Sequence, residues 1–255
     1  YLQFDGLKDA TYRKLRGCTL LDTKLAAIEN LRAVGVPVTL VATIKRGVND
    51  TQIGEIVKFG LDSPYVRGVN FQPVAFFGRG ERADIANRVT LSGIRREIET
   101  QTAGLIGKAD IIPLPCDVDR VAVTYLVKKD GAWIPITSRI KVEGYLELID
   151  NTMDFRAEDV VRNALARSIS KGVGCDCFKL MDEVMAILPS GYVKWTPRER
   201  VAFINTNTFR ITISSFVDMY NFDAKSIKRE CVHVITPDLR RIPFSAYNML
   251  HRSRG

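Results

Sequence analysis

The fold is decided by residues 38–44, which read Val38-Thr39-Leu40-Val41-Ala42-Thr43-Ile44. The run is β-branched and almost entirely apolar, and strands of this kind are typical of parallel sheets that are covered on both faces. It therefore predicts a buried central strand of an α/β protein. If that is right, the chain on either side should alternate strands with helices.

The residues before this strand predict a short strand and a helix. Residues 1–4 form a strand-like run that ends at the turn signal Asp5-Gly6. Apolar residues then recur at helical spacing over residues 21–34, and Gly35 is a typical C-terminal stop. Together with the strand at 38–44, these segments predict a βαβ unit.

The residues after the strand repeat the alternation. A helix is expected over residues 53–61, with Asn49 or Asp50 as its N-cap. A third strand is expected over residues 66–74, and a further helix begins at Thr90. The first part of the chain is therefore predicted to form a parallel sheet with helices packed against it.

The rest of the chain follows a different pattern. Lys128-Lys129-Asp130-Gly131 separates two β-rich runs and predicts a hairpin. Four further segments have an apolar pattern that reads as helical, at residues 142–149, 157–169, 178–188 and 211–220. Prolines beside Cys116 mark a boundary, so we expect one domain over residues 1–110 and an α+β domain over residues 111–255.

Composition limits the class of protein. The chain has 255 residues, 46% of them hydrophobic, so it can bury the core of one large domain or two modest ones. Its sequence contains no run of about 20 apolar residues, the length that a membrane-spanning helix needs. The start has neither a Met nor a basic segment, so we expect a fragment rather than a signal peptide.

Cysteine usage and charge indicate the compartment and the partners. Five cysteines in a chain of this length do not predict a disulfide framework, so a reducing cytoplasm is expected. The net charge of +8 is spread along the chain, with a basic excess near its C-terminal end. A positive surface favours anionic partners such as phosphates, anionic lipid or RNA, although a solvated basic face explains the charge equally well.

Polar side chains follow the ends of the three predicted strands, at Gln3, Asp5, Arg46, Asn70 and Gln72. In parallel α/β folds the carboxyl ends of the strands carry the ligand site. Asp5, on the same strand face as Gln3, could accept hydrogen bonds from an ammonium group, and Arg46 could clamp a carboxylate. Each residue alone also fits an ordinary loop cap, but three polar strand ends together favour a ligand site.

Candidate metal ligands lie later in the chain. Cys175-Asp176-Cys177 follows Gly172 and Gly174, so two thiols share a glycine-rich turn that suits a soft metal or an iron–sulfur cluster. Cys18 is expected to be a small buried hydrophobe, and His233 a hydrogen-bonded structural residue. The P-loop, HExxH and GxSxG motifs are absent from the sequence, so P-loop and serine-hydrolase chemistry have no support.

Several stretches share a likeness with one superfamily. They are Tyr1-Leu2-Gln3-Phe4-Asp5-Gly6, residues 12–17, residues 46–50, residues 69–74, residues 113–116, Cys231-Val232-His233 and residues 242–248. In these stretches the chain resembles radical-SAM enzymes, and within them the group that contains the dihydropterin methyltransferase-type and archaeal tetraether-synthase-type enzymes. The resemblance touches most of the chain; it is specific in the first 75 residues and near residues 231–248, and thin from about 150 to 205.

The resemblance implies the second half of a partial (βα) radical-SAM barrel, which is TIM-barrel-like, followed by a smaller α+β C-terminal domain. In such enzymes a [4Fe–4S] cluster cleaves S-adenosylmethionine to a 5′-deoxyadenosyl radical, which abstracts hydrogen from an unactivated carbon. The resemblance implies a transferase that acts on a lipid or pterin-like small molecule and takes electrons from a reductant protein. The expected location is the cytoplasm or the periphery of the membrane.

The resemblance also implies roles for individual residues. Contacts with the methionine, ribose and adenine parts of S-adenosylmethionine are expected from Gln3, Asp5, Arg46, Asn70 and Gln72. An auxiliary iron–sulfur or iron centre would be held by Cys116, Cys175, Cys177 and Cys231. No catalytic residue is assigned.

Two departures from the family pattern matter. The CxxxCxxC loop that binds the catalytic cluster belongs upstream of Tyr1, so this chain alone is expected to be inactive. Residues 117–120 and Ser245 stand where the family has cysteines, which argues against a full set of auxiliary centres. The alternative is a degenerate, non-catalytic barrel scaffold that binds RNA or an anionic membrane through a basic C-terminal face; nucleic acid is not an expected partner of the enzyme.

Overall fold

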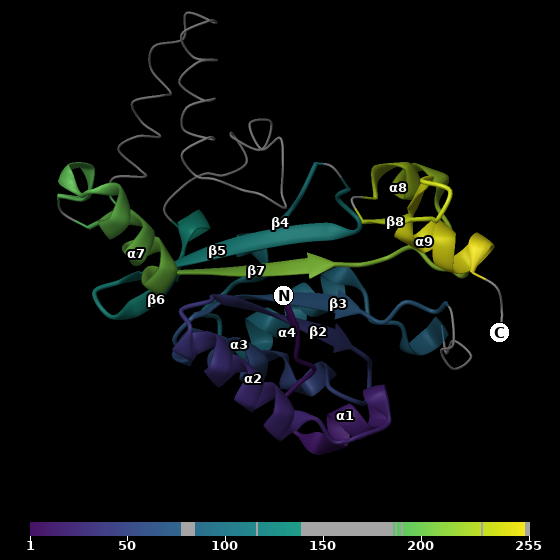
Figure 1. The fold of residues 1–255 in the computed structure, drawn as a ribbon, viewed down its shortest axis with the longest axis horizontal. Coiled ribbons are helices and arrows are strands. Elements are labelled where there is room, and N and C mark those ends of the chain that lie inside the picture. The colour runs from purple at the N-terminus through teal and green to yellow at the C-terminus, as the bar shows by residue number, and fades with distance from the viewer. Residues whose placement is uncertain are drawn as a thin grey trace, which may run out of the picture.

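The computed structural model describes residues 1–77, 85–115, 117–138, 186, 188–189, 191–230 and 232–252. Within these residues the main feature is one mixed seven-stranded sheet, with helices on one side of its parallel strands (Figure 1). The α/β class predicted from the sequence is confirmed. The partial barrel and the separate C-terminal domain stay predictions.

The sheet has a parallel half and an antiparallel half. The parallel strands are, in spatial order, β1 (Leu2–Gln3), β2 (Val38–Ile44), β3 (Val66–Pro73) and β7 (Thr208–Ser214). The antiparallel strands are β5 (Val121–Lys129), which pairs with β7, and its other neighbours β4 (Ile112–Pro113) and β6 (Ala132–Pro135). One sheet therefore includes strands from both sides of the boundary expected near residue 110.

The helices connect and flank these strands. The α-helices are α1 (Asp9–Arg16), α2 (Leu21–Ala33), α3 (Ile53–Asp62), α4 (Leu91–Gln101), α7 (Pro197–Asn207), α8 (Ala224–Arg229) and α9 (Phe244–Ala246). Short 3₁₀ turns occur at Asp50–Gln52, Ile85–Asn87, Lys108–Asp110, Ile136–Ser138 and Tyr192–Lys194, and a π turn at Tyr247–His251.

Local sequence signals explain most helix ends. The side chain of Thr90 accepts a hydrogen bond from the Gly93 amide at 3.0 Å and so caps α4, as predicted. Gly35 takes a left-handed φ of 72° just after α2, also as predicted. At α3 the prediction was wrong, because neither Asn49 nor Asp50 caps the helix; both side chains instead accept hydrogen bonds from amides of the preceding loop.

Side chains alternate between the two faces of the sheet. On β2 the residues Val38, Leu40, Ala42 and Ile44 are at most 2% exposed and pack against the helices, whereas the residues between them are half-buried. The same alternation places Phe209, Ile211 and Ile213 of β7 in the core. The expectation that β2 is buried on both faces was therefore wrong, because its second face is only half-buried and the helices of the described residues cover the first.

Two elements of the fold differ from the prediction. Residues 211–220 were expected to be helical, but residues 208–214 form β7, which lies between β3 and β5. α1 had not been predicted. In contrast, the hairpin is confirmed, since Asp130 and Gly131 take φ values of 50° and 84° between β5 and β6.

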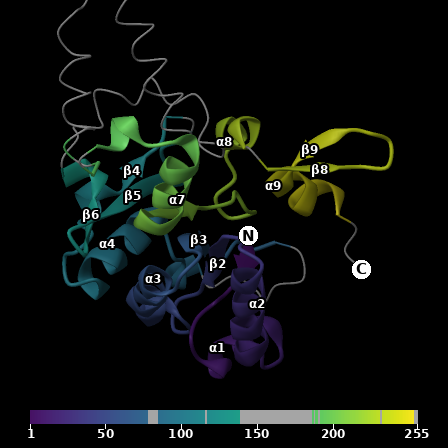
Figure 2. The same cartoon turned by 60° about the vertical axis from the view of Figure 1, so that its left-hand side comes forward.

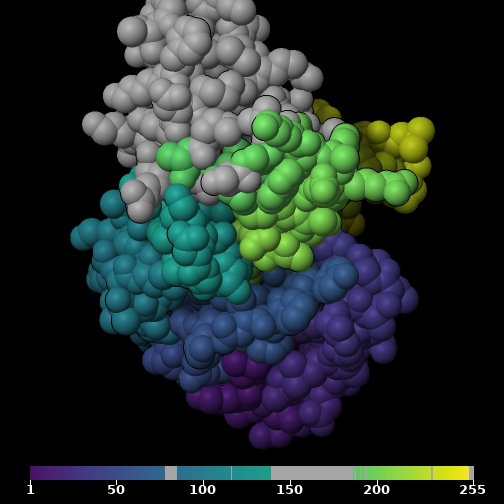
Figure 3. Space-filling view, turned by 90° about the vertical axis from the view of Figure 1, so that its left-hand side faces the viewer, coloured from purple at the N-terminus to yellow at the C-terminus, as the bar shows by residue number. Residues whose placement is uncertain are grey.

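Segments far apart in the chain lie side by side. Figure 3 shows the surface of α7 and β7 against the surfaces of the first 75 residues and of the β5–β6 hairpin. Arg67 at the start of β3 donates a hydrogen bond to Asn205 at the end of α7. Contacts that cross such long stretches of chain make this region one packed unit.

The C-terminal residues form a small group of helices and strands beyond the carboxyl end of β7 (Figure 2). It contains α8, α9 and an antiparallel pair, β8 (His233–Ile235) and β9 (Arg241–Pro243). The predicted helices 142–149 and 157–169, and most of 178–188, lie outside the described residues. Among the described helices, none is long and apolar enough to cross a membrane.

Candidate functional site

Among the described residues, the face of the parallel strands opposite to helices α1–α4 carries polar side chains. Strand register places Gln3, Val41, Asn70 and Thr212 side by side in one row across β1, β2, β3 and β7. Residues paired in this way point to the same side of the sheet. We call this surface the polar face. Its side chains form three rows that cross the strands, one at the amino edge, one in the middle and one at the carboxyl edge.

The row at the carboxyl edge is organised by Asp5, which is fully buried. Its carboxylate accepts hydrogen bonds from the side chain of Gln3 and from the Thr43 amide, the latter at 3.0 Å. Gln72 lies beside Thr43 in the register of β2 and β3. The structure therefore brings Asp5 and Gln72 to the same edge of the same face, and Gln3 of the middle row reaches Asp5 through its side chain.

Arg16 completes this row, and the sequence did not single it out. Its Nε donates to Asp5 Oδ2 at 2.8 Å, and its Nη2 donates to Asp5 Oδ1 at 3.0 Å and to Thr43 Oγ1 at 2.9 Å. The Arg16 side chain is 33% exposed, so part of the guanidinium faces outward. Arg16 belongs to residues 12–17, one of the stretches that carry the family resemblance, but no site role was predicted for it.

A buried tyrosine stabilises the turn after β1 at the same edge. The hydroxyl of Tyr12 donates a hydrogen bond to the Gly6 carbonyl at 3.0 Å, and its ring packs edge-on against Phe4. Burial, and after it the negative charge of Asp5, raises the pKa of Tyr12 to about 12. Tyr12 therefore stays a neutral hydrogen-bond donor that holds the turn after β1.

The middle row contains a buried side-chain carboxamide, that of Asn70. Asn70 is 8% exposed, and its Oδ1 is buried without a hydrogen-bond partner in the part of the chain that the structure describes. Leaving a buried acceptor unpaired costs about 1–3 kcal/mol, so native proteins rarely tolerate it without a reason. Asn70 lies at the centre of the polar face, where a ligand with an N–H group would satisfy it.

The row at the amino edge contains Arg210, which lies beside Gly68 of β3 and Tyr125 of β5. Its Nη2 donates to the Tyr1 hydroxyl at 2.7 Å, and Tyr125 is its second side-chain hydrogen-bond partner. Burial raises the pKa of the Tyr125 hydroxyl, although Arg210 opposes this change. Two phenols therefore flank one guanidinium on the same face as Asn70.

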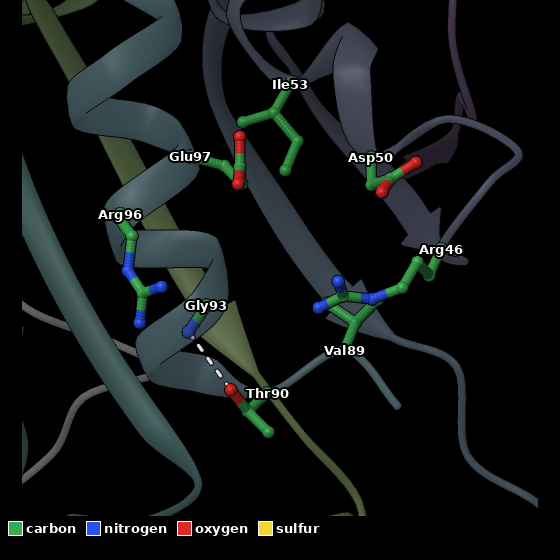
Figure 4. A pocket seen from close by; sticks show the side chains of 8 residues that line it. All are labelled: Arg46, Asp50, Ile53, Val89, Thr90, Gly93, Arg96 and Glu97. Carbon is green, nitrogen blue, oxygen red and sulfur yellow. Dashed lines mark hydrogen bonds between the residues drawn. The ribbon is translucent and has the colours of Figure 1, made fainter. Parts of the chain in front are cut away.

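Arg46 lies elsewhere. It lines a pocket of about 170 Å³ between the start of α3 and α4, together with Asp50, Thr90 and Arg96. In Figure 4 the Arg46 side chain extends from the end of β2 toward Val89 and the start of α4. The structure thus separates Arg46 from the predicted site residues, because the loop after β2 turns toward the helices.

A second buried carboxylate ties together the loops beyond the carboxyl edge. Asp218 accepts hydrogen bonds from Arg88 Nη2 and from the amides of Phe76 and Tyr220, each at 2.9 Å. Burial by itself raises the pKa of Asp218, but these hydrogen bonds and the charge of Arg88 outweigh it and lower the pKa. The hydrogen bonds of Asp218 fix the chain after β3 relative to the chain after β7.

The candidate metal ligands Cys116, Cys175, Cys177 and Cys231 lie outside the described residues. Cys18 is an exposed free thiol rather than the expected buried hydrophobe. Ser245 is buried and hydrogen-bonded to Glu230, whose pKa burial raises despite those bonds. Within the described part of the chain, no three His, Cys, Asp or Glu side chains are placed to hold a metal ion.

Comparison with known proteins gives one informative match, and no protein-family model matches the sequence. The chain is similar to a 7,8-dihydro-6-hydroxymethylpterin dimethyltransferase. That protein, from Methanocaldococcus jannaschii, is 35% identical over 290 aligned residues, which cover 99% of this chain and 56% of the relative. The chain thus spans about half the length of the curated relative, and the match supports the pterin methyltransferase group within the resemblance.

Proposed function

We propose that this chain is part of a radical-SAM enzyme that modifies an unactivated carbon of a pterin-like small molecule. The observation that carries the proposal is the polar face, at whose centre the buried Oδ1 of Asn70 has no partner among the described residues. The similarity to a dihydropterin dimethyltransferase along 99% of the chain supports the substrate class. A lipid substrate and the RNA- or membrane-binding scaffold are not proposed, because no observation favours them.

The donors and acceptors of the polar face fit S-adenosylmethionine. Arg16 presents the outward part of its guanidinium at the carboxyl edge and suits a carboxylate such as that of the methionine part. The carboxamides of Gln3, Asn70 and Gln72 can hydrogen-bond to a nucleoside. When bound, S-adenosylmethionine supplies a methyl group or a 5′-deoxyadenosyl radical.

Asp5 has a different role from the direct contact that the sequence suggested. Both carboxylate oxygens already accept hydrogen bonds from the protein, and the residue is fully buried. We assign Asp5 as a positioning residue that fixes Arg16 and Thr43 at the edge. Its buried negative charge also keeps the guanidinium oriented before a ligand arrives.

The iron–sulfur centres have no counterpart in the described residues. No three His, Cys, Asp or Glu side chains are placed there to hold a metal ion. We therefore assign no step of the reaction at a cluster to the described residues. The catalytic cluster is expected on the CxxxCxxC loop upstream of Tyr1, and the four later cysteines stay candidate ligands of an auxiliary centre. The proposal for the polar face does not depend on them.

A matched pair of arginine variants tests the proposal. In the full-length protein, Arg16→Lys keeps the charge next to Asp5 but loses the planar fork that binds a carboxylate on two bonds. We expect it to weaken S-adenosylmethionine binding at least tenfold by calorimetry, whereas Arg46→Lys, on the helix side, leaves the affinity within twofold. Equal effects of both variants, or no effect of Arg16→Lys, would remove the cofactor from the polar face.

A further inference from the structure

A buried asparagine joins two strand ends at the carboxyl edge of the polar face. Asn49 is fully buried, and its Nδ2 donates hydrogen bonds to the backbone carbonyls of Asp5 and Thr43, each at 2.8 Å. Its Oδ1 accepts a hydrogen bond from the Lys45 amide at 2.9 Å. Because a carboxamide has two N–H hydrogens, both are used here. One side chain therefore connects the end of β1 to the end of β2.

The bond to Asp5 is more than an ordinary loop cap requires. The bonds from Asn49 to Thr43 and Lys45 are local, and a side chain that only caps the loop after β2 would make them. The bond to Asp5 instead spans 44 residues of the chain. The paired part of β1 is only two residues long, so the place of Asp5 beyond its end depends on bonds of this kind.

The same two residues hold Arg16. The Asp5 carboxylate accepts two hydrogen bonds from the Arg16 guanidinium, and Thr43 Oγ1 accepts a third. Arg16 is thus bound by the side chains of Asp5 and Thr43, while Asn49 binds their backbone carbonyls. Asn49 has no exposed surface, whereas one-third of the Arg16 side chain is exposed. A ligand at this edge therefore meets Arg16 and not Asn49.

We infer that Asn49 is a positioning residue that sets where Arg16 presents its guanidinium to the carboxylate of the cofactor. The inference rests on the proposed function, in which Arg16 binds this carboxylate. Two parallel N–H···O bonds require an aligned fork, and a binding group must be held within about 0.5 Å of its productive place. Without the bond between Asn49 and Asp5 the two strand ends can separate, and Arg16 moves with Asp5. The loss is therefore specific to ligands that carry the carboxylate.

The test compares two ligands of the full-length protein by calorimetry. The probes are S-adenosylmethionine and its decarboxylated analogue, which lacks only the carboxylate. We expect the wild type to bind S-adenosylmethionine at least tenfold more tightly, and Arg16→Lys to lower this preference. Asn49→Ala should reduce the preference at least threefold and leave the affinity for the analogue within twofold. A purely structural role of Asn49 would weaken the binding of both ligands equally.

Gln101→Ala is the matched control. The Gln101 side chain accepts a hydrogen bond from the Gly54 amide at 2.9 Å and donates one to the Asp50 carbonyl at 2.7 Å. It therefore also joins two elements through their backbone, but it does so between α4 and the start of α3. We expect its loss to lower the melting temperature and to leave the preference within twofold of the wild type. Asn49→Asp keeps the size and the acceptor for the Lys45 amide, and it is the second variant if Asn49→Ala does not fold.

The outcomes separate this inference from the proposed function. If Arg16→Lys lowers the preference for S-adenosylmethionine but neither variant of Asn49 does, the positioning role is overturned and the proposed function stands. A loss of preference in Gln101→Ala as large as that in Asn49→Ala also overturns the role, because it shows a general effect of lost structure. If the wild type binds both ligands equally, the carboxylate contact of Arg16 fails, and the role of Asn49 fails with it.

Discussion

At the scale of single residues, the carboxyl edge of the sheet depends on one buried charge. Asp5 is fully buried and holds Gln3, Arg16 and Thr43 through its two oxygens. Buried ion pairs are poor sources of net stability, but removing one partner is costly because the other charge is left uncompensated. The fold and the candidate site therefore share this residue.

Asp5→Asn should destabilise the protein. Breaking a fully buried pair costs about 3–5 kcal/mol, and we expect about 2 kcal/mol here because Arg16 is one-third exposed and screened by water. Urea unfolding measures the change. Asp62→Asn, which breaks the exposed pair with Lys58, serves as the control and should cost less than about 0.5 kcal/mol. Equal losses for both variants would contradict the structural role of Asp5.

Asp218 should make stability depend on pH. Its pKa is lowered in the folded protein, so its contribution is complete above the unfolded pKa of about 4 and is lost as the pH falls through the lower folded value. The stability difference between the wild type and Asp218→Asn should be constant from pH 5 to 7 and shrink below about pH 4. Urea midpoints across this range measure it, and a difference that persists unchanged to about pH 2 would refute the ion-pair account.

Strand periodicity predicted which of the candidate side chains share one face of the sheet, and their contact with a ligand stays a prediction. Gln3, Asn70 and Gln72 belong to strands, so alternation alone placed them on one face, and Asp5 lies just beyond the end of β1. Arg46 lies in the loop after β2, and the spacing of apolar residues does not predict the side to which a loop turns. The arginine found at this edge is Arg16, whose position follows from a tertiary contact with Asp5.

At the scale of elements, α3 and β7 meet without space for a side chain. A Cβ added at Gly60 of α3 would lie 2.7 Å from the Phe209 ring, which also packs edge-on against Trp133. This contact connects residues about 150 positions apart. Close packing of α3 on β7 helps to hold β7 beside β3, and with it the polar face.

Gly60→Ala should therefore destabilise the protein by about 1–3 kcal/mol, the usual cost of overpacking a core. The loss should be smaller in a Phe209→Leu background, so that a double-mutant cycle gives a coupling above about 0.5 kcal/mol. Lys58→Ala on the exposed side of α3 is the matched control. Additive losses for Gly60 and Phe209 would show that the two residues do not touch.

The strands and helices of the first 101 residues could mostly be predicted because each has its own local pattern. β7 was missed although Phe209, Ile211 and Ile213 alternate with polar residues, a period of two that favours a strand. Its partners β3 and β5 lie far away in the sequence, and no local signal names them. Order within the sheet is a property of long-range packing.

At the scale of the whole molecule, the sheet divides its two faces between stability and binding. Helices cover one face with an apolar core, and the other face keeps polar groups from β1, β2, β3 and β7. The buried Oδ1 of Asn70 has no partner in the described part of the chain, and an unpaired acceptor that lowers stability often marks a ligand site. We therefore expect stability and binding to oppose each other there.

Asn70→Leu separates the two, because it replaces the carboxamide, whose Oδ1 has no partner among the described residues, by an apolar side chain of similar shape. The measurement is the affinity of the full-length protein for S-adenosylmethionine by calorimetry, with the melting temperature taken on the same samples. The account predicts at least a tenfold loss of affinity with an unchanged or higher melting temperature. An unchanged affinity, or a melting temperature that falls together with the affinity, would contradict it.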